Sequence, residues 1–380
     1  MAKPAKRKTA TFWASGKLDI TFLSLVLILV TIGLVMLFSA SYAYSYEYYG
    51  NSYKFIIQQA VVAAVGIGVM LFVSKINYHF LRKFALFIYI AVVILLIVLL
   101  ILPPMVKGMN VKRWMVIGPI NFQPSELAKF AIILLFSSLI AANYKQMKKF
   151  SFIAFLVGIL GFTCVLVVLE PHLSATILVF CLGIVLLVVG GLPKRYIFGG
   201  IGVGVGGVAA LILSGAISYG SDRIKYWLNP WLAPKEEGFQ TIQSLLAIGS
   251  GGILGRGIGQ SRQKYLWVPE PHNDFIFSIV CEELGLIGAV IIILLFCLLV
   301  WRGFTIAMRS PDKFGSLMAI GLTFQVGLQA MLNIWVVTNT IPNTGISLPF
   351  FSYGGTSLLI LLAEMGVVLS VSRSANVEKV

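Results

Sequence analysis

Charged side chains are scarce in this chain of 380 residues. Asp, Glu, Lys and Arg make up only 11% of it, whereas hydrophobic residues make up 58%. A soluble globular domain is about a quarter charged and about half apolar. The scarcity of charge therefore argues against a set of soluble domains. It favours one polytopic domain built for a lipid bilayer, where each spanning helix needs about 20 apolar residues.

Residues that bind metals or form disulfides are also few. The chain has three histidines and four cysteines, and no two cysteines form a Cys-x-x-Cys pair. A cysteine in an apolar run usually serves as a small buried hydrophobic residue. All four are of this kind, namely Cys164, Cys181, Cys281 and Cys297. No metal-ligand cluster is legible in the sequence.

Long apolar runs, in contrast, are abundant. Ten of them, separated by turn residues or charges, predict an all-α membrane protein with ten transmembrane helices at about 18–40, 54–73, 84–102, 125–142, 152–169, 173–190, 196–217, 274–301, 314–337 and 353–372. The first run is too long for the h-region of a signal peptide, which is about 7–15 residues. We therefore predict a basic tail over residues 1–17, a membrane domain over 18–372 and a short tail over 373–380.

The charges in the loops predict the orientation, because Lys and Arg accumulate on the cytoplasmic side of a membrane. With the N-terminus inside, the cytoplasmic segments contain the basic tail together with Lys75, Arg82, Lys83, Lys145, Lys148, Lys149, Lys194, Arg195, Arg302, Arg309, Lys313, Arg373 and Lys379. We predict that both termini are cytoplasmic. One large extracytoplasmic loop, about 218–273, then lies between helices seven and eight.

The outer segments nevertheless contain their own cations. They are Lys54, Lys107, Lys112, Arg113, Arg223, Lys225, Lys235, Arg256, Arg262 and Lys264. Long loops escape the topology rule, so one interpretation is a solvated surface. The other is a site for an anionic ligand, and phosphate suits clusters of Arg and Lys well. Nucleic acid is not expected outside a membrane.

One carboxylate is placed for chemistry. Asp274 lies in the run from Pro269 to Ser278, where the long polar loop meets an apolar helix. Glu282 and Glu283 follow eight and nine residues later. On a regular helix Glu282 lies closer to the face of Asp274 than Glu283 does. Glu282 could thus support a site more easily, although anchoring to neighbouring helices is the safer interpretation for both.

Several other polar residues interrupt the apolar pattern. Pro124 suits the first turn of the fourth helix, and Glu126 and Lys129 share a face of it. They form either an ion pair that joins helices or a pair that contacts substrate, because lipid-facing charges are costly. The loop from Pro342 to Gly355 is rich in helix-breaking residues, which indicates a segment lining a cavity or a plain outer turn. The role of Glu364, in the tenth helix, is not readable.

These residues together resemble a known family. The chain is similar to the SEDS proteins (shape, elongation, division and sporulation) over nearly its whole length. The matching segments are Lys112-Arg-Trp114, Gln123-Pro-Ser-Glu126 with Lys129, Pro271-His-Asn-Asp-Phe-Ile-Phe277 with Glu282-Glu-Leu-Gly285, and Leu348-Pro-Phe-Phe-Ser-Tyr-Gly-Gly355. Leu228-Asn-Pro-Trp231 and the stretch 257–264 look like the FtsW/SpoVE branch rather than RodA. One position departs from the family pattern, since His172 replaces the usual acidic residue after helix five.

The resemblance implies a peptidoglycan glycosyltransferase of the bacterial cytoplasmic membrane that polymerises lipid II outside the cell and releases undecaprenyl pyrophosphate. It implies Asp274 as general base. It implies substrate contacts at Arg113, Glu126, Lys129, Arg223, Arg256, Arg262, Lys264 and Ser352. Supporting roles fall on Trp114, Gln123, Pro124, Ser125, Glu170, His272, Glu282, Glu283, Gly354 and Gly355.

The resemblance further implies a class B penicillin-binding protein, a transpeptidase, as partner, beside other division or sporulation membrane proteins. No cofactor is required by the residues, although a divalent cation, Mg²⁺ or Mn²⁺, could assist the departure of pyrophosphate. Two rival functions stay open. A flippase for lipid-linked precursors would carry charged residues near the bilayer midplane, and a non-catalytic division scaffold would not need Asp274.

Overall fold

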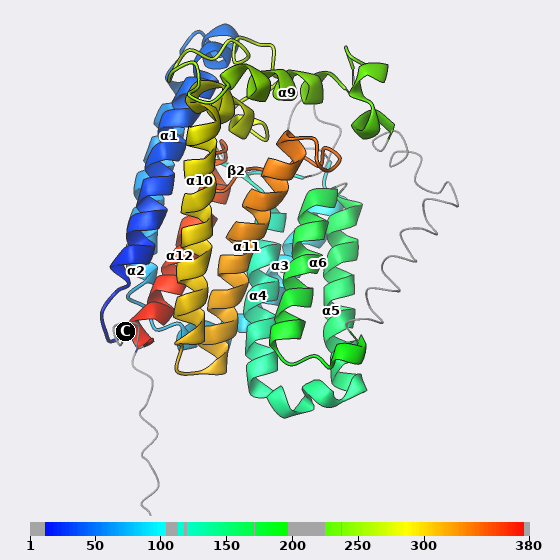
Figure 1. Ribbon diagram of the computed structural model, residues 1–380. Coiled ribbons are helices and arrows are strands. Elements are labelled where there is room, and N and C mark those ends of the chain that lie inside the picture. Colours follow the sequence, from blue (N-terminus) through cyan, green and yellow to red (C-terminus); the bar gives the residue numbers. More distant parts are fainter. Residues whose placement is uncertain are drawn as a thin grey trace, which may run out of the picture.

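The computed structural model describes residues 12–103, 113–117, 120–170, 172–196, 225–236 and 238–375. Within these ranges the chain is a bundle of long helices (Figure 1). Nearly all of the predicted seventh helix, 196–217, lies outside the described residues, as do Lys107, Lys112 and Arg223.

Nine of the ten predicted runs are helices in the described part of the chain. They are α1 (Ile20–Tyr49), α2 (Lys54–Val73), α3 (His79–Ile101), α4 (Pro124–Ala142), α5 (Phe150–Leu169), α6 (Leu173–Val189), α10 (Ile276–Met308), α11 (Lys313–Val337) and α12 (Gly355–Ser374). Eight of these are long and apolar enough to cross a membrane, and α6 is slightly shorter. The chain is therefore a multi-pass membrane protein, as its composition predicts.

Helix α1 continues well beyond its apolar run. The prediction ended it at residue 40, but it extends to Tyr49, where Gly50 adopts a left-handed conformation (φ 66°) and donates its backbone N–H to Tyr46 O. A glycine in this conformation is a common helix terminator. The capping residue, rather than the end of the apolar run, thus sets the length of this helix.

The start of α1 and the end of α12 lie together. Asp19 N donates to Ser372 Oγ at 3.2 Å, and Arg373 donates to Gly16 O at 3.0 Å. Arg302, near the end of α10, forms an ion pair with Asp19 at 2.8 Å. We call this the inner end of the bundle, and it also holds the α10–α11 turn (Figure 1). The opposite end is the outer end.

The outer end contains structure that the prediction left as loops. Helix α9 (Phe239–Gly251) lies across it, and a short 3₁₀ helix, η2 (Pro230–Leu232), precedes α9 (Figure 1). The strands β1 (Met115–Ile117) and β2 (Ile120–Phe122) pair as an antiparallel hairpin. The all-α prediction is therefore right for the bundle and wrong for this hairpin. A second 3₁₀ helix, η1 (Tyr144–Lys148), joins α4 to α5.

Helices α4, α11 and α12 are the most buried of the spanning helices. Their polar side chains therefore face other helices rather than lipid, which is the arrangement that the cost of an unsatisfied polar group in hydrocarbon demands. Polar residues on these three helices are therefore candidates for a functional site.

Helix α10 is interrupted at Gly285, which has φ 67° and ψ −169°. The break leaves backbone N–H and C=O groups of α10 without partners inside the helix, and residues 252–257 form hydrogen bonds with them. Arg256 N and Gly257 N donate to Glu282 O and Glu283 O, both at 3.0 Å, while Leu286 N and Ile287 N donate to Gly252 O and Ile253 O at 2.9 and 3.2 Å. The glycine-rich stretch thus completes a broken helix, and the backbone N–H groups of residues 256 and 257 are not available to cradle a phosphate.

We expect Gly285→Ala to destabilise the protein. Its backbone conformation is strained for any residue with a Cβ, and an added Cβ would lie 2.2 Å from Gly255 N. Such strain costs about 1–3 kcal/mol before the clash is counted. Thermal unfolding in detergent measures the loss. Gly158→Ala, where an added Cβ meets nothing within 4 Å, is the matched control and should not lower stability. Equal melting temperatures for both variants would contradict this view of the break.

Candidate active site

Asp274 lies at the outer end, two residues before α10 begins. Its side chain is half-buried. A methyl group placed on Gly345 would lie 3.2 Å from Asp274 Oδ2, so the carboxylate faces the loop before α12. Gly345 has a φ of 68°, and the absence of a side chain there leaves room beside the carboxylate.

The backbone of Asp274 is held by an amide from inside the bundle. Asn333 of α11 is fully buried. Its Nδ2 donates to Asp274 O at 2.7 Å and to Ile346 O at 2.6 Å. One side chain therefore ties the segment carrying the carboxylate to the loop that faces it.

The breaker-rich loop, residues 342–355, is fastened to the segment 272–274 by further hydrogen bonds. Ser352 Oγ donates to Asn273 O at 2.8 Å and accepts from Leu348 N at 2.7 Å, and Tyr353 N donates to His272 O at 2.8 Å. The Ser352 hydroxyl thus both donates and accepts a hydrogen bond within the protein. The geometry gives Ser352 a structural role and does not support the predicted contact with substrate.

His272 is packed among aromatic rings. Its ring centroid lies 4.5 Å from that of Phe55, 4.7 Å from Tyr44 and 6.0 Å from Tyr353. Burial lowers the pKa of His272 to about 4, so the imidazole is neutral near pH 7. Gly354 N donates to Gln59 Oε1 at 3.3 Å, and Gly355 begins α12. These contacts agree with the supporting roles predicted for His272, Gly354 and Gly355.

The electrostatic surroundings of Asp274 come from two charged neighbours. The pKa of Asp274 is raised to about 6, mainly by burial and also by the Glu270 carboxylate, while Arg113 opposes the rise. Arg113 is half-buried and directly precedes Trp114 and β1. The sequence pointed to Arg113 but not to Glu270, whose exposed side chain accepts from Asn273 Nδ2 at 2.9 Å.

A second carboxyl shares Arg113. Glu170 is fully buried, and neither of its carboxylate oxygens has a hydrogen-bond partner among the described residues. Burial raises the pKa of Glu170 to about 8, and Arg113 again opposes the rise. Glu170 therefore holds a proton near neutral pH, whereas Asp274 has lost most of its own. Arg113 is thus a common electrostatic neighbour of both carboxyl groups.

The start of α4 packs against the turn between α5 and α6. Gln123 Nε2 and Ser125 Oγ both lie 3.2 Å from His172 Nδ1. Burial, helped by Arg113 and Lys129, lowers the pKa of His172 to about 3. His172 is consequently a neutral hydrogen-bonding residue near pH 7. Pro124 occupies the first helical turn, as predicted, and is buried.

Glu126 and Lys129 form an ion pair with 2.9 Å between Oε2 and Nζ. Lys129 is 1% exposed and also donates to Gln329 Oε1 of α11 at 3.0 Å. Gln329 Nε2 continues to Ser347 Oγ at 3.1 Å. The pair therefore joins α4 to α11 and to the breaker-rich loop, which favours the helix-joining interpretation over direct contact with substrate.

Sequence reasoning missed the polar stripe on α11. Gln325, Gln329 and Asn333 are four residues apart, so they share one face of the helix. Gln325 Nε2 donates to Glu364 Oε2 of α12 at 2.8 Å, which gives Glu364 a partner that the sequence did not reveal. Amides repeated every fourth residue in an apolar run were the signal that could have found this stripe.

Glu282 and Glu283 anchor the segment 256–264. Glu282 accepts hydrogen bonds from the Ser261 hydroxyl and from Arg262 N at 3.0 Å, and it forms a longer ion pair with Arg256 Nε at 3.7 Å. Glu283 accepts from Lys264 Nζ at 3.1 Å. Glu283 also accepts from Ser39 Oγ of α1 at 2.6 Å, so it contacts a neighbouring helix as expected, whereas the contacts of Glu282 are to the segment 256–264 rather than to a helix.

Lys264 is correspondingly removed from the phosphate-binding candidates. It is 3% exposed, and besides Glu283 it donates to Ser39 Oγ of α1 at 3.0 Å. Arg256 is partly occupied by Glu282 and by Ser250 O, at 3.2 Å. Arg262 keeps an exposed side chain. Arg262 therefore stays a candidate for binding phosphate, as do Lys225 and Lys235, whose side chains are also exposed.

No group of three or more His, Cys, Asp or Glu side chains arranged to hold a metal ion occurs in the described ranges. Asp274 is a carboxylate of the kind that Mg²⁺ prefers as a ligand, but it belongs to no such group in these ranges. A bound Mg²⁺ would supply charge neutralisation to a leaving pyrophosphate. The mechanism below uses only the side chains of the chain itself.

Known proteins of one family are similar to the chain along nearly all of its length. Residues 19–377 match the family described as cell cycle protein, FtsW/RodA/SpoVE. Stage V sporulation protein E of Bacillus subtilis (strain 168) is 39% identical over 329 residues, which are 86% of this chain and 88% of that protein. The probable peptidoglycan glycosyltransferase FtsW of Geobacter sp. (strain M18) is 37% identical over 328 residues, with 85% and 88% coverage.

Solved structures have the same fold. A chain in the structure reported as "Structural coordination of polymerization and crosslinking by a peptidoglycan synthase complex" is similar with a TM-score of 0.79 and 28% identity. The rod shape determining protein RodA of Thermus thermophilus is similar with a TM-score of 0.70 and 27% identity. Each comparison covers 94% of this chain and 98% of the other. The chain therefore belongs to the FtsW/RodA/SpoVE family of SEDS membrane proteins.

Proposed function

We propose that this chain is a peptidoglycan glycosyltransferase that polymerises lipid II at the outer face of the bacterial cytoplasmic membrane, with Asp274 as general base. The observation that carries the proposal is the half-buried Asp274 carboxylate at the outer end of a membrane bundle, with a pKa raised to about 6 and a neighbouring arginine. Names of relatives support the reaction class, since an FtsW relative is called a probable peptidoglycan glycosyltransferase.

The reaction requires a proton acceptor, because a sugar hydroxyl is a poor nucleophile. The 4-hydroxyl oxygen of one lipid II attacks the anomeric carbon of the donor sugar as its proton passes to a carboxylate oxygen of Asp274. The bond from the anomeric carbon to the pyrophosphate oxygen breaks, and that oxygen keeps the electron pair. Arg113 lies where it can stabilise the new charge, since it acts electrostatically on both Asp274 and Glu170.

A proton at Glu170 fits the same scheme. Glu170 is buried beside Arg113 and has a pKa of about 8. In its neutral form it does not compete with a phosphate for the guanidinium. A neutral Glu170 adds no negative charge to the surroundings of Arg113, and this favours the approach of an anionic leaving pyrophosphate.

The orientation follows from the positive-inside rule. The inner end holds Lys75, Lys145 and Arg373 among other cations, so we place it in the cytoplasm together with both termini. The segment over 218–273 is then extracytoplasmic. The site around Asp274 faces outside, where lipid II is polymerised.

The partner and the cellular process also belong to the proposal. A similar chain occurs in a peptidoglycan synthase complex that couples polymerisation with crosslinking. A class B penicillin-binding protein therefore suits this chain as its transpeptidase partner. The identity of 39% to a sporulation protein and of 37% to an FtsW favours septal or spore wall synthesis over elongation.

A lipid flippase is the second candidate, because one observation favours it. Glu126, Lys129 and Glu364 place charged or ionisable groups inside the bundle, as transporters do. Proteoliposomes with lipid II separate the two functions. Glycan strands from the purified protein support the polymerase, whereas a change in the sidedness of lipid II without strands supports the flippase.

Asp274→Asn should abolish polymerisation of lipid II by the purified protein. Removal of a general base costs about 10²–10⁴-fold in rate, and the amide keeps the size of the side chain. Glu270→Gln, which removes a carboxylate four residues away, is the matched control and should retain most activity near pH 7.5. Gel analysis of glycan strands and thermal stability are measured together. A stable Asp274→Asn protein that polymerises normally would remove Asp274 from the mechanism.

The pH dependence of polymerisation should reflect the ionisation of Asp274. A base works only when deprotonated, so kcat/KM should rise with pH through about 6 and then level off. Glu270 raises the pKa of Asp274 and Arg113 lowers it. Glu270→Gln should therefore move the rise to lower pH, and Arg113→Gln should move it to higher pH while also weakening turnover. Shifts of both variants in one direction would show that another group titrates.

Glu126→Ala and Lys129→Ala should each lower thermal stability, and the double variant should lose less than the sum. Removal of one partner leaves a buried charge unpaired, at a cost of about 3–5 kcal/mol, whereas removal of both does not. A double-mutant cycle in detergent measures the coupling. Arg302→Ala breaks the ion pair with Asp19 at the inner end. The stability losses of Glu126→Ala and Arg302→Ala should be additive when the two changes are combined. Additivity for the first pair as well would mean that Glu126 and Lys129 do not interact.

A further inference from the structure

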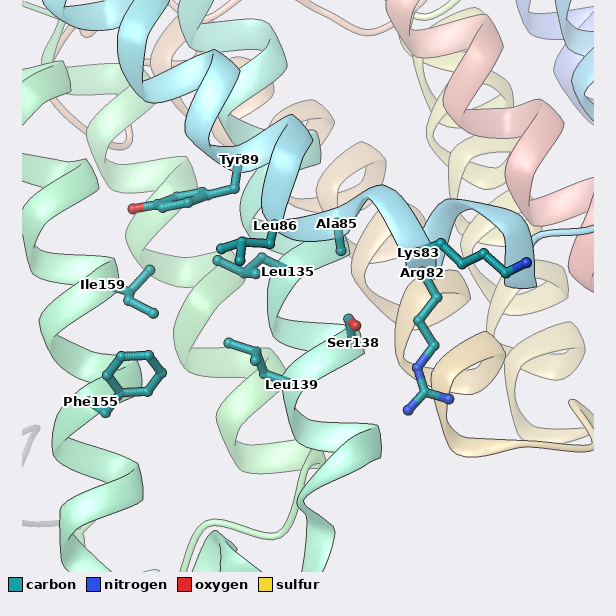
Figure 2. A pocket seen from close by; sticks show the side chains of 10 residues that line it. All are labelled: Arg82, Lys83, Ala85, Leu86, Tyr89, Leu135, Ser138, Leu139, Phe155 and Ile159. Carbon is teal, nitrogen blue, oxygen red and sulfur yellow. The ribbon is translucent and has the colours of Figure 1, made fainter.

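A groove opens between α3, α4 and α5 in the inner half of the bundle. Figure 2 shows the side chains that line it: Ala85, Leu86 and Tyr89 come from α3, Leu135, Ser138 and Leu139 from α4, and Phe155 and Ile159 from α5. Arg82 and Lys83, from the first turn of α3, complete the lining. The groove lies in the inner half of the bundle, whereas Asp274 lies at the outer end.

The walls of the groove are apolar. Leu86 and Phe155 are 61% and 54% exposed, and both would face lipid in a membrane. Tyr89, at one end, has its hydroxyl 2.9 Å from Thr163 Oγ1 of α5. The hydroxyl is therefore satisfied between the helices, and Tyr89 presents its apolar ring to the groove.

The mouth of the groove carries positive charge. Arg82 extends past Ser138 toward the inner end (Figure 2). Lys83, the next residue of α3, extends from the helix in a different direction. Both side chains are exposed. Neither forms an ion pair with a carboxylate of the part of the chain that the structure describes. The Arg82 guanidinium lies 5.8 Å from the ring centroid of Phe314, which keeps it near the groove and leaves its N–H groups free for an anion.

The size of the groove limits what it can hold. Its volume is about 260 Å³, slightly below the range of about 300–1,000 Å³ for small-molecule sites. This space suits a segment of one acyl chain rather than a whole lipid. An anionic headgroup would then lie at the level of Arg82, where the negative surface of the cytoplasmic leaflet attracts cations.

We propose that this groove binds one anionic phospholipid of the inner leaflet, with Arg82 and Lys83 at the phosphate and an acyl chain against Leu86, Leu139 and Phe155. The argument rests on the combination of an apolar, lipid-facing groove with two exposed cations at its inner mouth. It uses the inner orientation of α3 but not the chemistry at Asp274. A lipid held here packs against α4, which carries the ion pair of Glu126 and Lys129 at its other end.

Native mass spectrometry of the full chain tests the proposal. The protein, purified in detergent, is offered phosphatidylglycerol or phosphatidylcholine with the same acyl chains. Phosphatidylglycerol should be retained preferentially. Since a cation at a membrane surface contributes about fivefold to binding of an anionic lipid, Arg82→Gln with Lys83→Gln should weaken retention of phosphatidylglycerol by about 25-fold. Lys148→Gln with Lys149→Gln, two exposed inner cations outside the groove, is the matched control and should change retention little.

A second pair of variants tests the groove itself. Leu86→Trp adds bulk inside it, whereas Phe87→Trp changes the neighbouring residue, which is 71% exposed and does not line it. Both positions face outward, so both variants should fold. Only Leu86→Trp should reduce lipid retention. Three outcomes would overturn the proposal. The protein could retain the two phospholipids equally, the two double charge variants could lose retention equally, or Leu86→Trp and Phe87→Trp could have equal effects. So would preferential retention of a polyprenyl phosphate over phosphatidylglycerol, because the occupant would then be a carrier lipid.

Discussion

The hydrogen bonds donated by Asn333 are the interaction on which the site depends. Irregular backbone at the end of a membrane bundle must find partners within the protein. Asn333 Nδ2 supplies them to Asp274 O and Ile346 O from a fully buried position. The two irregular segments that it joins are the one that carries the candidate base and the one that faces it. Without the Asn333 amide, the carbonyl groups of Asp274 and Ile346 would both lose this hydrogen bond.

The same constraint explains the other irregular feature of the outer end. The break at Gly285 leaves carbonyl and N–H groups of α10 unpaired, and the segment 252–257 satisfies four of them. Glu282 and Glu283 then hold the continuation of that segment through its backbone and through Lys264. The segment 252–264 is therefore fastened to the bundle by buried polar contacts near the end where Asp274 lies.

The sequence was sufficient to predict the spanning helices of the described part of the chain and to single out Asp274 as a candidate, but not to predict how the polar groups pair. Apolar runs of helical length predict helices because lipid permits few alternatives. The hairpin β1–β2 and helix α9 have no such constraint, and they were missed. Lys264 was assigned to substrate as one of the outer cations, and Ser352 because of the family resemblance. Their partners, Ser39 and Asn273, lie far away in the sequence, so only the folded chain shows that they are already engaged.

The central claim is that the fold holds Asp274 as a carboxyl that ionises near pH 6 at the outer end of the bundle. Infrared difference titration tests it most directly, since a protonated carboxyl has its own C=O stretching band. The Asp274 band is isolated by subtraction of the Asp274→Asn spectrum from that of the unaltered protein. The account predicts that this band disappears with a midpoint of about pH 6, in keeping with the burial of the carboxyl. A midpoint near 4, the ordinary value of a solvated aspartate, would contradict it.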